Sequence, residues 1–264
     1  MNPNPKEMTM LNDTSIVAPV APTPVGLAVA ASGLVRRYGE GDSAVEAVRG
    51  VSLDVPSGQF AAIMGPSGSG KSTLMHLLAG LDSPTEGAVE IGGHDITRMS
   101  DKQLTLLRRK HIGFVFQAYN LVPTLTAEEN VTLPLAIAGR RNENGWVDDV
   151  MERVGLGDRR SHRPAALSGG QQQRVAVARA LVAEPTVLFA DEPTGNLDSR
   201  TSTEVLELLR DAVSAYGQTT VMVTHDPRAA AMADRVLFLA DGGVVSDVER
   251  PTEGELLETV KELS

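Results

Sequence analysis

Hydrophobic positions along the chain form short runs that alternate between two spacings. Compact runs typical of β-strands occur at Leu27–Val35, Ala44–Val55, Phe60–Met64, Ile112–Phe116, Thr186–Ala190, Thr219–Val223 and Val236–Leu239. Apolar positions at helical spacing occur at Ser72–Ala79, Gln171–Val182, Thr201–Ser214 and Arg228–Met232. Because strand and helix patterns alternate, the sequence predicts an α/β protein built on a largely parallel sheet.

The two ends and the middle of the chain depart from this alternation. Residues 1–26 are rich in Pro, Asn, Thr and Ala without periodicity, and they are predicted to be a disordered leader. Residues from about 118 to 166 are predicted to be a helical insert, with a capping box that begins at Thr126. The main domain is expected at 27–250, and residues 251–264 are expected to form a charged surface helix.

A glycine-rich loop joins the third apolar run to the helix after it. Its residues are Gly65, Pro66, Ser67, Gly68, Ser69, Gly70, Lys71, Ser72 and Thr73. Glycines let successive backbone N–H groups face inward as a nest for anions, and the helix start adds its positive end. Lys71 would bind the β- and γ-phosphates, and the Ser72 hydroxyl would suit Mg²⁺. This spacing between strand and helix favours an ATP-binding loop over a simple glycine-rich turn.

An acidic pair, Asp191 and Glu192, follows the buried run Val187–Ala190. Carboxylates at the carboxyl end of a parallel strand lie where α/β sheets bind their ligands. Asp191 is predicted to hold Mg²⁺, through water, and Glu192 to polarise the water that attacks the γ-phosphate. An Asp-Glu pair also occurs at ordinary helix starts, but its place after a phosphate loop favours catalysis.

A second glycine-rich segment, Leu167–Gln171, precedes another predicted helix. It contains Ser168, Gly169, Gly170 and Gln171, and it is predicted to be a second anion site without a lysine. Ser168 can instead be a helix N-cap. Capping and anion binding use the same free N–H groups, so the two interpretations are compatible.

These motifs resemble the nucleotide-binding domain of ATP-binding cassette (ABC) transporters, and the resemblance covers about residues 27–248. Further family motifs follow in order: Gln117 after a strand, Gly195–Asp198, and Thr224–Asp226. The segment Leu167–Gln171 corresponds to the family's signature segment. The resemblance implies a P-loop core with an N-terminal antiparallel β-subdomain and an inserted helical subdomain.

The resemblance also implies roles for residues far apart in the sequence. In this family two domains pair head to tail, and each ATP lies between the phosphate loop of one copy and the signature segment of the other. Gln117 would then bind Mg²⁺ and sense the γ-phosphate, which His225 would hold while positioning Glu192. Asp198 would connect the two sites of the dimer. Tyr38 would stack on adenine, although it could also be an ordinary residue at a strand end.

The segment Phe116–Val131 is similar to the branch of the family that releases lipoproteins, exports macrolides or resists peptide antibiotics. In that branch an apolar groove around Tyr119–Leu125 receives a helix of a separate membrane permease, although these residues could simply pack the helical insert. The implied function is an ATP-hydrolysing subunit that drives export or extraction of a lipoprotein, peptide or drug. The alternative is a regulatory ATPase that acts on a cell-division or other non-transport membrane partner.

Charge and composition narrow the choice of partners. The net charge of −10 argues against nucleic acid, whose phosphates require a basic surface. No apolar run approaches the roughly 20 residues that span a bilayer, and the N-terminus lacks the pattern of a secretory signal. The absence of cysteine fits a reducing compartment. The expected location is therefore cytoplasmic, at the inner face of the cell membrane.

Overall fold

The structure, a computed structural model, describes residues 26–41, 44–142 and 145–263. The predicted leader therefore lies outside the described residues, apart from Gly26. The strands are β1 (Leu27–Tyr38), β2 (Val45–Pro56), β3 (Phe60–Met64), β4 (Glu86–Ile91), β5 (His94–Asp95), β6 (Ile112–Phe116), β7 (Val187–Asp191), β8 (Thr219–Val223), β9 (Arg235–Ala240) and β10 (Gly243–Glu249). The helices are α1 (Lys71–Leu78), α2 (Asp101–His111), α3 (Ala127–Ala138), α4 (Trp146–Arg153), α5 (Gly169–Leu181), α6 (Ser199–Tyr216), α7 (Pro227–Ala230) and α8 (Glu253–Glu262).

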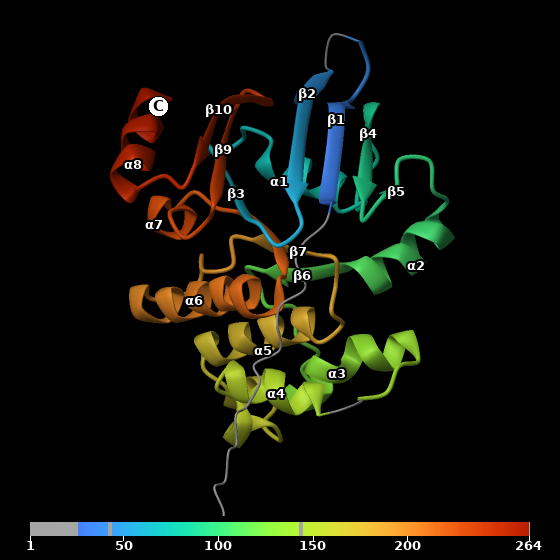
Figure 1. Cartoon of the computed structure of the whole chain (residues 1–264), viewed down its shortest axis with the longest axis vertical. Helices are drawn as coiled ribbons and strands as arrows, with labels where there is room; N and C mark the ends of the chain where they lie inside the picture. Colours follow the sequence, from blue (N-terminus) through green and yellow to red (C-terminus); the bar gives the residue numbers. More distant parts are fainter. Residues whose placement is uncertain (1–25, 42–43, 143–144, 264) are drawn as a thin grey trace, which may run out of the picture.

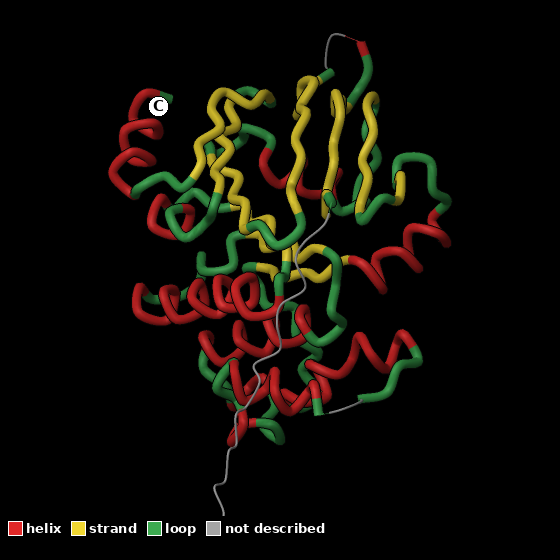
Figure 2. Tube along the Cα trace, viewed as in Figure 1, coloured by secondary structure: helices red, strands yellow, loops and turns green. Residues whose placement is uncertain are grey.

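The described strands form two sheets, which occupy the upper and central parts of Figures 1 and 2. The larger sheet has the order β10-β9-β3-β8-β7-β6, and its strands are parallel except that β10 runs antiparallel to β9. The smaller sheet, β2-β1-β4-β5, is antiparallel. This arrangement confirms the predicted α/β class with a separate antiparallel sheet.

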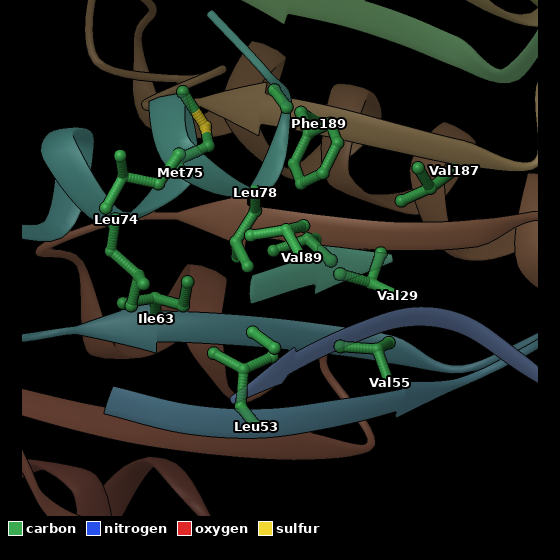
Figure 3. Packing of buried hydrophobic residues seen from close by; sticks show 14 of the residues in the cluster. Val29, Leu53, Val55, Ile63, Leu74, Met75, Leu78, Val89, Val187 and Phe189 are labelled. Carbon is green, nitrogen blue, oxygen red and sulfur yellow. The ribbon is translucent and has the colours of Figure 1, made fainter. Parts of the chain in front are cut away.

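The parallel sheet is buried on both faces, which explains the unbroken apolar run of β3. All five residues of β3 are buried. Ala61 and Ile63 pack into the cluster that contains α1 and the antiparallel sheet, whereas Phe60 faces the cluster that contains α5 and α6. Figure 3 shows the first cluster, in which side chains from β1, β2, β3, β4, α1 and β7 converge. Consequently α1 and α5 cover opposite faces of the parallel sheet.

The helices α3, α4 and α5 form the lower part of the molecule around a third apolar cluster (Figure 1). The predicted capping box at the start of α3 is confirmed. Thr126 Oγ1 accepts a hydrogen bond from the Glu129 N–H at 3.2 Å, and Glu129 Oε2 accepts one from the Thr126 N–H at 2.8 Å. Residues 118–166 carry α3, α4 and two short 3-10 turns, Gly157–Arg159 and Pro164–Ala166.

Several elements of the fold have no clear pattern in the sequence. Helix α2 is strongly polar, and Leu107 is its only buried residue. Strand β10 has no fully buried residue, so its apolar positions do not stand out. The predicted surface helix at the C-terminus is instead partly buried, because Leu256 is in the core while Val260 and Leu263 pack against it. These elements depend on contacts with residues that are distant in the sequence.

Candidate nucleotide site

The glycine loop lies between β3 and α1, as the sequence predicts. Gly70 is the N-cap of α1 and has φ +100°, and a Cβ there would lie 2.1 Å from the carbonyl oxygen of Ala47. Only glycine therefore fits the position. The first intrahelical hydrogen bond runs from the Leu74 N–H to Gly70 O at 2.8 Å, so the amides of residues 71–73 precede it. These amides and the helix dipole suit an anion.

The side chain of Lys71 folds back over the loop. Its Nζ donates to Gly65 O at 2.9 Å and to Pro66 O at 2.8 Å. An ammonium has three N–H bonds, so one remains for an anion in the pocket. Burial lowers the pKa of Lys71, and the negative charges of Glu192 and Asp191 oppose that shift. The loop thus presents a partly desolvated cation beside two carboxylates.

Glu192 and His225 meet at the ends of neighbouring strands, β7 and β8. His225 Nδ1 lies 2.8 Å from Glu192 Oε1 and 2.6 Å from Oε2. Because a carboxylate only accepts hydrogen bonds, Nδ1 carries the proton in this contact. The backbone of Glu192 is left-handed, with φ +46°, and its N–H donates to Val223 O at 2.9 Å. This strained conformation at a strand end is typical of a functional residue.

A pocket of about 410 Å³ brings the loop and this pair together. It is lined by Met64, Gly65, Pro66, Ser67, Lys71, Glu192, His225, Phe238, Val260 and Leu263. Phe238, Val260 and Leu263 were not predicted from the sequence. The helical spacing of Leu256, Val260 and Leu263 is a signal that could have marked the last two residues as facing inward, although not as lining this pocket.

Asp191 is suited to a cation. Burial raises the pKa of its carboxyl group, and Oδ1 is buried without a hydrogen-bond partner among the described residues. Strand β6 pairs with β7 in parallel, and Phe116 lies opposite Asp191. Gln117 follows Phe116, so it lies at the same edge of the sheet as Asp191. With Ser72 in the first turn of α1, a carboxylate, an amide oxygen and a hydroxyl are available, which are ligands that Mg²⁺ accepts.

This donor set contains only one predicted carboxylate ligand. Across the described ranges, no group of three or more His, Cys, Asp or Glu side chains is arranged to hold a metal ion. Mg²⁺ at nucleotide sites is commonly bound by one or two carboxylates together with the substrate's phosphates. The residues at this edge therefore fit a Mg²⁺ ion that arrives with a nucleotide.

Gln117 is fixed against the loop that follows Glu192. Its Nε2 donates to Asn196 Oδ1 at 3.3 Å, and Asn196 Nδ2 donates to Gln117 O at 3.0 Å. A Cβ at Gly195 would lie 2.6 Å from Gln117 Nε2. The glycine therefore leaves space for the glutamine side chain, and the two motifs are in direct contact.

The signature segment begins α5 and is capped as the sequence allows. Ser168 Oγ accepts from the Gln171 N–H at 3.3 Å, and Gln171 Oε1 accepts from the Ser168 N–H at 3.0 Å. A Cβ at Gly170 would lie only 2.1 Å from Thr201 Cγ2. Thr201 Oγ1 in turn donates to Asp198 Oδ2 at 2.7 Å. The signature segment and Asp198 are thus parts of one structure at the starts of α5 and α6.

The structure does not bring every predicted site residue into the pocket. Ser168, Gly170 and Asp198 are not among the described residues that line it. The signature segment starts α5, which packs on the face of the parallel sheet opposite α1. Tyr38 also lies outside the lining, at the end of β1, where it is 43% exposed.

The fold and the loop define the class of protein. A phosphate loop between a strand and a helix, with carboxylates at the end of a strand of the same parallel sheet, characterises a P-loop nucleotide hydrolase.

Comparison with known proteins gives the family. The family described as ABC transporter matches residues 48–195. The chain is 49% identical over 216 residues to the macrolide export ATP-binding/permease protein MacB of Marinobacter nauticus, covering 81% of this chain and 33% of that protein. It is 47% identical over 216 residues to the lipoprotein-releasing system ATP-binding protein LolD of Geobacter metallireducens, covering 81% and 96%. The chain belongs to the ABC transporter family and is one of its ATP-binding, ATP-hydrolysing cassettes.

Solved structures agree with this assignment. One of them is the dimeric post-hydrolysis structure of the ATP-binding cassette MJ0796 bound to ADP and Pi. Its sequence is 40% identical to this chain, the match covers 85% of this chain and 99% of that one, and the TM-score is 0.76.

The chain spans about a third of the length of the macrolide export relatives that it matches. In the described part of this chain, no helix has the length and apolar character needed to cross a membrane.

Proposed function

We propose that two copies of this chain bind ATP between them and that closing and hydrolysis drive a separate membrane permease. The observation that carries the proposal is the position of the two anion-binding helix starts. The phosphate loop and the signature segment belong to helices on opposite faces of one sheet, which supports a site in which a second copy supplies the signature segment to each ATP. ATP then favours closure through its higher affinity for the closed dimer.

Within each site, this chain's residues hold the triphosphate and the attacking water. Lys71 and the amides of residues 71–73 bind the β- and γ-phosphates, and Tyr38 stacks on adenine. Ser72, Gln117 and Asp191 would hold Mg²⁺, which would neutralise part of the charge of the phosphates.

Glu192 accepts the proton of the attacking water, because its carboxylate lies beside the loop in the same pocket. His225 donates from Nδ1 to that carboxylate and thereby fixes its orientation. The other ring nitrogen, Nε2, donates to the γ-phosphate when it also carries a proton. Ser168, Gly169, Gly170 and Gln171 of the second copy contact the same phosphate, and Asp198 lies between the two sites.

A complementation experiment tests whether the sites form between copies. Lys71→Ala inactivates the phosphate loop, and Ser168→Arg inactivates the signature segment, so each variant alone should lack ATPase activity. A mixed dimer contains one site built from the intact loop of one variant and the intact signature segment of the other. An equal mixture is therefore expected to recover roughly a quarter of wild-type activity, since half of the dimers are mixed and each has one site of two.

The control for complementation is each variant mixed with itself at the same total concentration. Phosphate release is measured for all samples. A mixture that is no more active than the separate variants would contradict a site shared between copies.

The permease is proposed to dock in a groove of about 480 Å³ between α2, β6, α3 and α5. Its lining includes the apolar side chains of Ile112, Phe114, Phe116, Leu133, Pro134 and Ile137. Ile137 is 56% exposed. Of the segment 119–125, Asn120 lines this groove, whereas Leu121 packs against the helical core.

Three arginines line the same groove: Arg108, Arg109 and Arg179. Arg108 donates to Gly80 O at 2.7 Å, and Arg179 donates to Tyr119 O and Asn120 O. None of the three forms an ion pair with a carboxylate among the described residues. An amphipathic helix with an acidic residue fits such a groove, and a permease would present it at the inner face of the membrane. The relatives' names favour a macrolide or a lipoprotein as the exported or released molecule.

Substituting Ile137→Asp is expected to reduce recovery of the membrane partner at least tenfold, because a charge would be buried in the apolar part of the interface. The tagged chain is recovered from solubilised membranes, and its partners are identified by mass spectrometry. The control is Leu257→Asp, which places the same charge at another exposed apolar residue, on α8. Equal recovery with both variants would contradict docking in this groove, and recovery of cell-division proteins would favour the regulatory alternative.

A further inference from the structure

The exposed ring of Tyr38 is held by two charged side chains. The guanidinium of Arg36 lies over one face of the ring, with Cζ 4.5 Å from the ring centroid. The phenolic hydroxyl donates to Asp82 Oδ2 at 2.8 Å. Arg36 Nη2 in turn lies 2.8 Å from Asp82 Oδ1. The three side chains form a closed triangle in which each contacts the other two.

This triangle joins the strand that carries the ring to the turn that follows α1. Arg36 and Tyr38 are two residues apart on β1 and therefore share one face of the strand. Asp82 lies in the turn after α1, where its N–H donates to His76 O at 3.2 Å. Since α1 begins at Lys71, the carboxylate that anchors the ring follows the helix that starts in the phosphate loop.

Only part of the ring remains available to a ligand. Arg36 covers one face, and Asp82 engages the hydroxyl edge, yet Tyr38 keeps 43% of its surface exposed. Since Arg36 lies over one face, the exposed surface is expected to include the opposite face of the ring. Val45, which pairs with Tyr38 across the β1–β2 ladder, is 62% exposed beside it. Contacts with Tyr38, and also with Asp82, raise the pKa of Arg36, so the guanidinium stays charged.

We propose that Arg36 and Asp82 are positioning residues that hold the Tyr38 ring with one face open to the adenine of ATP. The inference rests on the proposed stacking of adenine on Tyr38. A ring that is already fixed loses little freedom when the base binds, so more of the stacking energy appears as affinity. Removing either charged partner keeps the tyrosine side chain but leaves its ring free to rotate.

The variants Asp82→Ala and Arg36→Met are each expected to weaken ATP binding about three- to tenfold. This is the entropic cost of immobilising one side chain, the Tyr38 ring, when the ligand binds. Calorimetric titration of the full chain measures this affinity. Inorganic tripolyphosphate has no base, so its affinity should stay unchanged. The matched control is Arg37→Met, because Arg37 pairs with Glu46 instead. An equal loss of tripolyphosphate affinity would overturn the positioning role.

The variant Tyr38→Ala separates this inference from the proposed function. It should weaken ATP binding, and adding Asp82→Ala should then have little further effect, because there is no ring left to hold. If Asp82→Ala weakens ATP binding equally with and without Tyr38, or has no effect when Tyr38→Ala does, the positioning role is wrong. Unchanged ATP affinity in Tyr38→Ala would instead overturn the adenine site itself.

Discussion

Substituting Glu192→Gln is expected to lower ATP turnover by roughly 10²–10⁴-fold, the usual contribution of a general base. Glutamine has nearly the same shape, and its amide oxygen can still accept a hydrogen bond from His225 Nδ1. It cannot accept a proton from water, however. ATP affinity should therefore be retained, and the ATP-bound dimer should persist because hydrolysis no longer opens it.

Two measurements together check this expectation. Phosphate release gives the turnover, and sedimentation with ATP or ADP gives the fraction of dimer. The control is Glu207→Gln on α6, an exposed residue that does not line the pocket and undergoes the same change of charge. Unchanged turnover in Glu192→Gln would show that another group is the base.

The second large effect is expected from Lys71→Ala, which should reduce ATP affinity by about 10²-fold or more. The ammonium is buried beside the loop, and charge-assisted hydrogen bonds of this kind contribute roughly 1.5–3 kcal/mol each. Alanine also removes the bonds to Gly65 O and Pro66 O, so the loop loses an internal support as well as a positive charge.

Calorimetric titration with ATP checks this prediction, and thermal unfolding without nucleotide checks the fold. Lys110→Ala is a suitable control, since it removes an exposed lysine at the end of α2 and leaves the loop intact. Retained ATP affinity in Lys71→Ala, with the control also normal, would exclude the loop as the phosphate site.

The glycine loop could be placed between a strand and a helix from the sequence because its conformation depends on contiguous residues. Glycines shape the backbone locally, and Lys71 lies at the start of the helix. The strand β3 was equally clear, since a strand buried on both faces must be apolar throughout. Capping boxes, such as that at Thr126, also depend on residues only three positions apart.

Elements with sparse apolar patterns could not be predicted in this way. Helix α2 buries only Leu107, and β10 has no fully buried residue. The sequence of α8 is highly charged, so its contribution of Val260 and Leu263 to the nucleotide pocket was missed. Whether such a residue faces solvent or a pocket depends on what packs against it, which periodicity alone does not contain.

The sequence by itself therefore determined the α/β class, the phosphate loop, the acidic pair after β7 and the family. The tertiary structure alone decided which of these parts meet. It joins Glu192 to His225, places Tyr38 in contact with Arg36 and Asp82, and separates the signature segment from the loop. The physical reason is that local motifs act through neighbouring backbone, whereas these contacts arise between residues that only the folded sheet brings together.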